Sequence, residues 1–585
     1  MLRDTTCGEL RIENVGKEVE LCGWVSKIRN LGALCFVDLR DTYGITQINI
    51  DPTYFEENKL HNEYCIQVKG IVQERSSKNK EIPTGDIEVK ATSYVILSKS
   101  KQTPFIIADK TDALEDTRLK WRYLDLRRPV LQNYLKLRYK TLKVVRDFFD
   151  KKGFFEIETP TLIKSTPEGA RDYLVPSRTY PGNFYALPQS PQLYKQILMV
   201  AGMDKYFQIA RCYRDEDQRA DRQPEFDQID VEQSFVDKED MLNLIEELLD
   251  TVWMEIRGIK LPKFERLSYA DCVNRFGTDK PDMRFGMELK DVSFMSHDNF
   301  KGFEGKVVKA INVKNTAKDI SRKKMAADEE LTNKFGVPHL MHAKFENGQW
   351  NCSAFKFFSE DTLNKLKEVM GAEENDTIII AADSSLEKAA FALGALRCRY
   401  ARDLGLIKKG DFKPLFVIDW PLFAKTEKGY ESMANPFTLP NKEDIPLIDS
   451  APEKMHSTSY DTVMNGEELS SGALRIYDKE LQWKVFELLG LTDEDISKRF
   501  GFFVDAFDYG FPPEGGFGIG VERLCMTLFE TDNIRDVVAF PKNLMGAEPM
   551  SSCPSRVDDE NIDILGLEVK PDVKAELERK ENLKK

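Results

Sequence analysis

The stretch FQIARCYRDEDQRADRQPEFDQIDVEQSF, residues 207–235, decides the fold of the region around it. Two runs of alternating apolar and polar residues flank a loop dense in Arg and Asp, and such alternation predicts a pair of half-buried strands. One expected apolar face carries Phe207 and Ile209, and the other carries Ile229, Val231 and Phe235. We predict a β-hairpin whose polar face binds a charged ligand; a solvated loop between edge strands remains the alternative.

Length and composition limit the classes of protein to which the chain can belong. Its 585 residues suggest roughly three or four domains. No apolar run of about 18 residues and no secretory signal is present, so we expect no membrane span and a cytoplasmic location. The ten cysteines form no CxxC pair, and the five histidines form no HExxH motif. A zinc ribbon and histidine-based metal chemistry are therefore not favoured.

The first part of the chain predicts a small all-β domain. Five strand candidates, separated by Gly-containing turns, lie within residues 1–103. Five short strands in this length are typical of an OB-fold barrel, which often binds single-stranded nucleic acid. Arg29, Phe36 and Gln47 suit such a surface, although Phe36 as a core residue is the alternative.

Beyond the barrel we expect a polar linker over 104–130 and then a helix that stops at Gly153. A strand over 154–160 and a helix over 238–256 complete a first block, 131–286. The pattern then changes to a self-contained α+β unit over 287–410 with a hairpin turn at Asn347-Gly348. A second Gly-rich block follows over 411–555, opening with a buried strand over 415–423, and a charged extension over 556–585 ends the chain. The predicted class is multidomain α/β (α+β).

Three stretches together resemble the signature motifs of class II aminoacyl-tRNA synthetases. FFDKKGFFEIETP resembles the first, FQIARCYRDED with FDQID the second, and GFGIGVER the third. TPEGARDYLVPSR and LPQSPQLYKQ are similar to the bacterial aspartyl-type members of subclass IIb. The resemblance implies an OB-fold anticodon-binding domain, an antiparallel catalytic sheet, an inserted domain of the GAD-like kind, and a homodimer built on the first motif.

The resemblance also implies a reaction. L-Aspartate and ATP would give aspartyl-adenylate and pyrophosphate, and aspartate would then pass to the 3′ end of tRNA(Asp). Because this chemistry gathers negative charge, positioning and fixed cations would carry it. The family's two catalytic arginines match Arg214 and Arg523. Its other ATP-binding positions match Asp215, Glu216, Gln223, Glu468, Gly520, Val521 and Glu522, and its Mg²⁺ positions match Asp461, Glu468 and Ser471.

Aspartate recognition is implied by the same resemblance. Lys195 and Arg475 match the pair that holds the side-chain carboxylate, and an asparagine amide cannot satisfy two buried cations. Arg214 would also hold the substrate α-carboxylate, and the acceptors around the ammonium match Glu168, Gln192 and Asp230. In the barrel, the anticodon-reading positions match Arg29, Leu31, Phe36, Gln47 and Glu88.

Two departures from the bacterial pattern keep alternatives open. Ala434-Asn435-Pro436-Phe437 stands where the family has His-His-Pro-Phe in the closing loop. GEELSSGALRI and GGFGIGVER are closer to archaeal and eukaryotic relatives. Leu31, where some relatives that also charge tRNA(Asn) have histidine, favours a discriminating enzyme. The alternatives are a form that also charges tRNA(Asn), an asparaginyl- or lysyl-type enzyme, and a non-catalytic RNA-binding paralogue.

Overall fold

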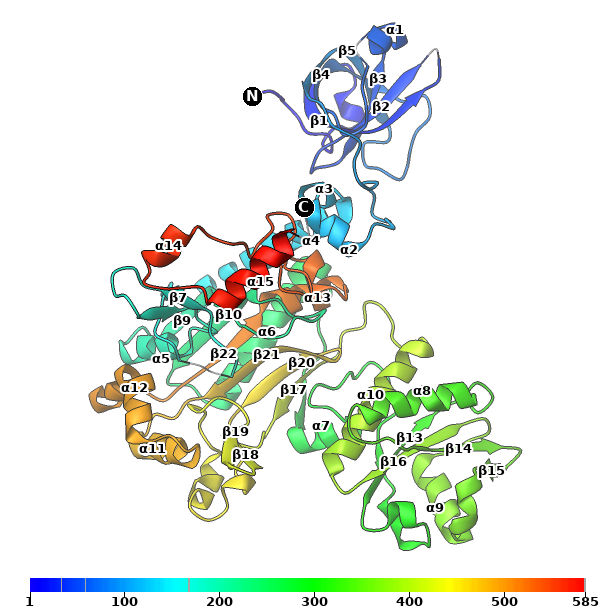
Figure 1. Ribbon diagram of the computed structural model, residues 1–585. Helices are drawn as coiled ribbons and strands as arrows, with labels where there is room; N and C mark the ends of the chain where they lie inside the picture. Colours follow the sequence, from blue (N-terminus) through cyan, green and yellow to red (C-terminus); the bar gives the residue numbers. More distant parts are fainter. Residues whose placement is uncertain (33, 58, 167–168, 583–585) are drawn as a thin grey trace. The chain divides into compact units, whose positions relative to one another are not determined.

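The computed structural model describes residues 1–32, 34–57, 59–166 and 169–582 (Figure 1). The chain divides into two compact units. The first comprises residues 1–137 and 535–555, and the second comprises 138–534 and 556–585. Each unit is described by itself below.

The first unit contains a closed five-stranded barrel of order β1-β2-β3-β5-β4, which confirms the predicted OB-fold. Its core is formed by the alternate apolar residues of the strands, such as Leu21, Val37 and Val89, because successive side chains of a strand point to opposite faces. The strands are β1 (Glu18–Asn30), β2 (Cys35–Arg40), β3 (Ile45–Ile50), β4 (Cys65–Glu74) and β5 (Ile87–Ser98), with helix α1 (Pro52–Glu57) between β3 and β4.

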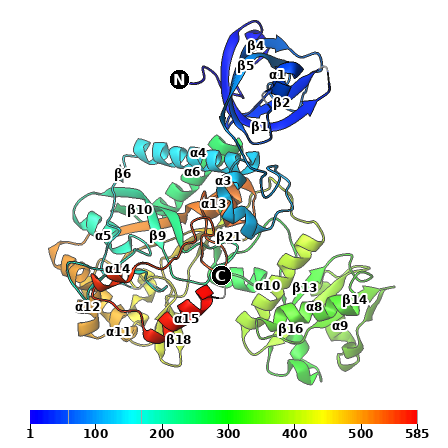
Figure 2. The ribbon, with the colours of Figure 1, turned by 45° about the horizontal axis from the view of Figure 1, so that its top comes forward.

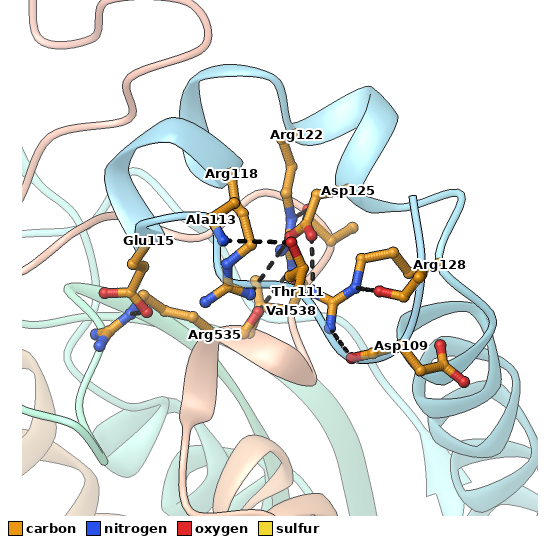
Figure 3. A network of polar contacts seen from close by, with 12 residues as sticks. Asp109, Thr111, Ala113, Glu115, Arg118, Arg122, Asp125, Arg128, Arg535 and Val538 are labelled. Atoms are coloured by element: carbon orange, nitrogen blue, oxygen red, sulfur yellow. Dashed lines mark hydrogen bonds and ion pairs between the residues drawn. The ribbon is translucent and has the colours of Figure 1, made fainter. Parts of the chain in front are cut away.

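The segment that we expected to be a linker contains two helices, α2 (Glu115–Lys120) and α3 (Arg122–Asp125). A buried charge network that we call the hinge cluster holds them, with Asp125 at its centre (Figure 3). Arg122 and Arg128 donate to different oxygens of Asp125, at 2.7 and 2.8 Å. Arg122 also donates to the carbonyls of residues 535, 538 and 539, each at 2.8 Å. The segment 535–555, which we had grouped with the catalytic block, is therefore anchored in the first unit.

The second unit is built on an eight-stranded sheet of order β11-β17-β20-β21-β22-β10-β9-β6. All neighbours are antiparallel except β11 with β17 and β6 with β9, which confirms the predicted antiparallel catalytic sheet. In sheet order the strands are β11 (Glu265–Ser268), β17 (Pro414–Ile418), β20 (Tyr460–Met464), β21 (Glu467–Leu474), β22 (Glu514–Gly520), β10 (Glu225–Ser234), β9 (Lys205–Tyr213) and β6 (Phe155–Glu156).

The predicted hairpin is formed by β9 and β10, paired in register from Glu225 opposite Tyr213 to Gln233 opposite Lys205. One detail of the prediction was wrong. The strand ends at Ser234, and Phe235 has a φ of 58° and is 73% exposed, so it does not continue the apolar face. The expected polar face is buried as well, since Asp230 and Glu232 are inaccessible to solvent. The hairpin is thus an inner part of the sheet with charge on its covered face.

Helices flank this sheet. They are α4 (Pro129–Lys151), α5 (Gln192–Val200), α6 (Lys238–Arg257) and α13 (Val521–Phe529). The helix predicted over 238–256 is α6, which begins at a capping box of Asp237 and Asp240 and ends at Gly258 in the left-handed conformation. The buried strand predicted over 415–423 is interrupted, because Asp419 has a φ of 54° and the chain turns before β18.

The inserted segment forms its own five-stranded sheet of order β12-β13-β16-β14-β15 (Figure 2). The two faces of this sheet are covered by separate apolar cores. Asn347 and Gly348, both with positive φ, make the predicted turn. Gly394 of α10 meets Gly277 so closely that a Cβ would lie 2.2 Å from the Gly277 carbonyl oxygen. The strands are β12 (Lys290–Asp291), β13 (Val307–Val313), β16 (Thr377–Asp383), β14 (Met341–Glu346) and β15 (Gln349–Asn351), and the helices are α7 (Tyr269–Phe276), just before the insert, α8 (Arg322–Asn333), α9 (Glu360–Met370) and α10 (Leu386–Asp403).

Smaller elements complete the second unit. They are β7 (Leu174–Pro176), β8 (Phe184–Ala186), β18 (Phe423–Thr426), β19 (Gly429–Ser432), α11 (Lys479–Leu488), α12 (Asp493–Val504), α14 (Asp559–Asp563) and α15 (Pro571–Asn582). Among the helices described in both units, none is long and apolar enough to cross a membrane.

Candidate active site

A cavity of about 460 Å³ opens on the sheet of the second unit. Its walls come from strands β10, β21 and β22, helix α5, the loop between β9 and β10, and the segment around Ala434. The predicted site residues that line it are Gln192, Lys195, Arg214, Glu216, Gln223, Glu468, Ser471, Arg475, Gly520, Glu522 and Arg523. Glu168 lies outside the residues that the structure describes.

Glycines of β22 make room for the polar side chains of β10. Gly518 and Gly516 lie opposite Asp230 and Glu232. A Cβ on Gly516 would lie 1.9 Å from Oε2 of Glu232, and one on Gly518 would lie 2.1 Å from Nε2 of Gln228. The Gly-rich motif is therefore required by packing, because any larger residue would displace the polar side chains of the neighbouring strand.

A buried charge cluster that we call the pocket cluster borders one end of the cavity: Lys195 and Arg475, which line it, and Asp230, Glu232 and Glu514, which do not. Nζ of Lys195 donates to Oδ1 of Asp230 at 2.9 Å and lies 3.2 Å from Oε2 of Glu232. Arg475 donates from Nε and Nη2 to the two oxygens of Glu232, at 2.8 and 3.2 Å. Burial lowers the pKa of Arg475, but the charge of Glu232 outweighs it and raises that pKa above its usual value. Arg475 thus remains charged.

Glu232 was missed by the sequence-based prediction, although it joins the two residues predicted to bind the aspartate side chain. A signal for it was present, because in IDVEQ it lies two residues after Asp230 and so on the same face of the strand. The sequence did not indicate that this face is buried against Lys195 and Arg475.

Several buried polar atoms around the cavity have no hydrogen-bond partner among the described residues. They are Nε2 of Gln192, Oδ2 of Asp230, Oγ1 of Thr438 and Oγ of Ser459. Buried polar groups are rarely left unpaired in a native fold, and a ligand in the cavity would supply partners for these four atoms. Gln192 and Asp230 were predicted as aspartate ligands, whereas Thr438 and Ser459 were not.

Thr438 is held beside Arg475 by the loop that departs from the bacterial pattern. The backbone N–H of Phe437 donates a hydrogen bond to Oδ1 of Asn435 at 2.9 Å. The backbone N–H of Ile476 donates to the carbonyl of Phe437, also at 2.9 Å. The Phe437 ring is buried against Phe486, Phe500 and Phe503. The loop is therefore anchored by apolar packing, and Ala434 and Asn435 line the cavity.

The other end of the cavity carries the two predicted catalytic arginines. The Arg214 guanidinium lies over the Phe226 ring, 5.1 Å from its centroid, and its backbone N–H donates to Pro224 at 2.8 Å. Arg523 follows Gly520 in the first turn of α13, donates to the Glu468 carbonyl at 2.7 Å, and lies 3.5 Å from Asp221. Both side chains therefore have fixed positions along the cavity wall.

Three of the residues predicted to bind ATP are engaged elsewhere. The carboxylate of Glu522 accepts from Arg138 at 2.8 Å and from the Asp227 backbone N–H at 3.1 Å, so we assign it a structural role. Val521 is fully buried, and Asp215 pairs with Arg171 at 3.4 Å and does not line the cavity. Glu216 does line it and pairs with Arg222 at 2.5 Å.

The predicted metal ligands lie together on β20 and β21. Asp461 is opposite Ser471 across the strand pair, and burial, with the nearby charge of Glu468, raises the pKa of Asp461 well above its usual range. Glu468 and Ser471 line the cavity, whereas Asp461 is half-buried beside them on the neighbouring strand and is not part of its lining. No group of three or more His, Cys, Asp or Glu side chains suited to a metal was found in the described part of the chain.

Three of the residues predicted to read the anticodon, Arg29, Gln47 and Glu88, form one hydrogen-bond network on the barrel. Arg29 donates to Asp38 at 2.6 and 2.8 Å and to Gln47 at 3.0 Å, and Gln47 donates to Glu88 at 2.6 Å. Phe36 is half-buried on β2, opposite Arg29 of β1, so it is not a closed core residue. Leu31 is 68% exposed. We call the hydrogen-bonded set of Arg29, Asp38, Gln47 and Glu88 the barrel network.

Family comparison agrees with this geometry. Residues 114–544 match the model described as "tRNA synthetases class II (D, K and N)", and residues 19–97 match the OB-fold nucleic acid binding domain. The chain belongs to the class II tRNA synthetase family. The synthetase motifs quoted from the sequence lie within the matched range.

Relatives of this synthetase extend over almost its whole length. The chain is 46% identical to an "Aspartate--tRNA(Asp/Asn) ligase" of Geobacillus sp. (strain WCH70), covering 97% of this chain and 98% of the relative. It is also 46% identical to an "Aspartate--tRNA ligase" of Listeria welshimeri, with the same coverage. Among solved structures, asparaginyl-tRNA synthetase from Pyrococcus horikoshii, complexed with asparaginyl-adenylate, has a TM-score of 0.59 at 19% identity and covers 92% of this chain and 98% of its own. That likeness shows the fold alone.

Proposed function

We propose that this synthetase is an aspartate–tRNA ligase, which activates L-aspartate with ATP and transfers it to the 3′ end of tRNA(Asp). The observation that carries the proposal is the pocket cluster, in which two buried cations lie beside unpartnered polar atoms at the end of the cavity. The relatives named as aspartate ligases support the same substrate.

Recognition of the aspartate side chain follows from the two cations. Arg475 and Lys195 would share their donors between Glu232 and the substrate carboxylate. An asparagine amide would turn N–H donors toward these cations, and a site that leaves buried polar groups unpaired rejects the wrong substrate by about 10⁴-fold or more. Asp230 and Gln192, each with an unpartnered atom, would meet the ammonium end of the substrate.

Activation would depend on the arginines at the other end of the cavity. Attack of the substrate carboxylate on the α-phosphate gathers negative charge, which guanidinium groups stabilise with paired hydrogen bonds. Arg214 would hold the α-phosphate and the substrate carboxylate, and Arg523 would hold the distal phosphates, with Glu216 and Gln223 placed to contact the nucleotide. Because both arginines are already fixed, little reorganisation is needed when the charge develops.

Glu468, Asp461 and Ser471 would hold a magnesium ion. The pKa of Asp461 is raised by burial and by the neighbouring Glu468 charge, and a bound divalent cation would relieve this repulsion. Mg²⁺ usually takes only one or two carboxylates, with phosphate oxygens and water completing its shell. The ion would neutralise phosphate charge during the reaction.

We also propose a cytoplasmic homodimer. Tyr139, Phe155 and Leu162 are exposed large apolar residues in or near the first motif, and β6 is an edge strand of the sheet. Covering such residues with a second copy would remove apolar surface from water. The ten free cysteines agree with a reducing compartment.

The direct test is aspartate-dependent exchange of labelled pyrophosphate into ATP by the purified chain. We expect exchange with aspartate and at least 10³-fold lower kcat/KM with asparagine or lysine. Exchange with asparagine or lysine but not with aspartate would refute the assigned substrate, and no exchange with any of them would favour a non-catalytic paralogue.

The choice between tRNA(Asp) alone and both tRNAs needs its own experiment, because similar relatives carry both kinds of name. We propose the discriminating form, based on the exposed Leu31 beside the barrel network. Charging of transcripts that differ only in the aspartate or asparagine anticodon tests it, and equal aspartylation of both would overturn it.

A further inference from the structure

Glu514 is a buried acid whose two carboxyl oxygens have no hydrogen-bond partner among the described residues. It begins β22 and is 1% exposed. Its backbone carbonyl accepts the N–H of Arg475 at 2.9 Å, which fixes it next to the pocket cluster. Glu514 does not line the cavity, so it lies behind the residues that would meet the substrate.

The charges around Glu514 come from several elements. The charge of Glu232 on β10 raises the pKa of the Glu514 carboxyl beyond the rise that burial causes. The charges of Arg475 and Lys195 lower this pKa, but they offset the rise only in part. The other ionisable groups of the cluster are Asp230 on β10, Tyr206 on β9 and Tyr460 on β20. Tyr206 donates to Gln208 and Tyr460 donates to the Gly516 carbonyl, so neither hydroxyl is directed at Glu514.

Charge balance decides which form of Glu514 suits the substrate. Lys195 and Arg475 are already paired with the carboxyl groups of Asp230 and Glu232, so neither cation of the cluster is left over as a counter-ion for Glu514. An ionised Glu514 would add a third anion within the same buried space. A substrate side-chain carboxylate would then enter a site that is already negative, and a buried charge without compensation is strongly unfavourable.

We propose that Glu514 is a positioning residue that must carry its proton for the pocket to accept a side-chain carboxylate. Neutral Glu514 leaves Lys195 and Arg475 with Glu232 as their shared counter-ion and with donor capacity for the substrate. Ionised Glu514 competes for the same cations. The inference rests on the proposed aspartate specificity and adds that aspartate binding depends on the proton of this residue.

The test compares wild type with Glu514→Gln, a neutral side chain of nearly the same shape. The KM for aspartate is measured by pyrophosphate exchange from pH 6.5 to 9. We expect the wild-type KM to rise at least tenfold more over this range than that of Glu514→Gln, whereas the KM for ATP changes less than twofold with either enzyme. Identical pH profiles for aspartate would overturn the proposal.

Glu368→Gln on the exposed face of α9 is the matched control, and it should keep the wild-type profile. If Glu514→Gln does not fold, Glu514→Leu provides a second neutral side chain with the same expected profile. Failure of the proposed function can be told apart from failure of this proposal. If wild-type enzyme shows no aspartate-dependent exchange at pH 6.5, the assignment of aspartate as substrate is wrong, whatever the protonation state of Glu514.

Thermal unfolding gives an independent readout. A folded-state pKa above the unfolded value means that the folded chain holds the proton more tightly, so stability falls as the pH rises from the unfolded pKa toward the folded one. We therefore expect the melting temperature of wild type to fall relative to that of Glu514→Gln between pH 5 and pH 8. A constant difference across this range would contradict a protonated Glu514.

Discussion

The hinge cluster and the pocket cluster are both buried groups of Arg, Lys and carboxylate side chains, yet they differ in how completely they are paired. In the hinge cluster, each carboxylate oxygen of Asp125 accepts a hydrogen bond from an arginine (Figure 3). Arg122 also donates hydrogen bonds to backbone carbonyls. In the pocket cluster, Asp230 keeps one oxygen unpartnered and Glu514 keeps two, within the part of the chain that the structure describes. Burial and charge alone therefore do not mark a functional site; the pocket cluster is distinguished because Lys195 and Arg475 also line the cavity.

The largest expected effect is on the pocket side of this comparison. Replacement Arg475→Leu removes the cation that bridges Glu232 and the substrate, and loss of one partner of a buried pair costs about 3–5 kcal/mol. We expect kcat/KM for aspartate to fall by about 10³-fold while ATP still binds. Pyrophosphate exchange and ATP binding measured by calorimetry check this.

The control for this variant is Arg397→Leu, which removes a buried arginine of α10 that donates to the carbonyls of Asp282 and Phe285. It should lower stability without raising the KM for aspartate. If Arg475→Leu activates aspartate normally, the side-chain assignment is wrong.

The next effect belongs to the hinge side. Asp125→Asn removes the only carboxylate that Arg122 and Arg128 share among the described contacts, so it leaves buried positive charge uncompensated. We expect a loss of about 3 kcal/mol in unfolding free energy. Denaturant unfolding followed by far-UV circular dichroism measures this.

The same variant separates the two clusters. The KM for aspartate should stay within about twofold of wild type, because no substrate contact is removed. If Asp125→Asn instead raises the KM for aspartate strongly without loss of stability, the hinge cluster is not purely structural, and the distinction from the substrate-binding pocket cluster is wrong.

A smaller effect is expected at the two unpartnered hydroxyls. Thr438→Val and Ser459→Ala remove no internal hydrogen bond, so stability should hold, whereas a lost bond to substrate costs about 0.5–1.5 kcal/mol. We expect each to raise the KM for aspartate by about three- to tenfold in the exchange assay. A drop in melting temperature with an unchanged KM would show that these hydroxyls serve the fold.

The smallest effect concerns the barrel network, whose members hydrogen-bond one another and must exchange partners to meet RNA. Glu88→Gln keeps the shape of the side chain but removes the charge that Gln47 and Asn49 contact. We expect the KM for tRNA to rise by about threefold to fivefold, near the value of one neutral hydrogen bond. Aminoacylation measures this, and pyrophosphate exchange without tRNA should not change.

Sequence patterns predicted the barrel, the hairpin, helix α6 and the inserted sheet because each depends on local periodicity and on turn residues. They also indicated Lys195, Arg214, Arg475 and Arg523, which lie in motifs. They did not indicate Glu232, Thr438 or Ser459 as site residues, since their roles arise from contacts between strands and loops far apart in the chain. The anchoring of 535–555 by Arg122 was missed for the same reason: its acceptors are backbone carbonyls, which have no signature in side-chain patterns.

The position of the inserted domain has a consequence for how such a chain can change over time. The strands on either side of it, β11 and β17, are direct neighbours paired in parallel, with Glu265 opposite Leu415 and Ser268 opposite Ile418. Residues 269–413 therefore leave and rejoin the sheet between adjacent strands, and the insert has apolar cores of its own. A single genetic event could exchange this inserted domain without separating any strand pair of the catalytic sheet, provided that a crossover of about a dozen residues or more still joins the two parallel strands.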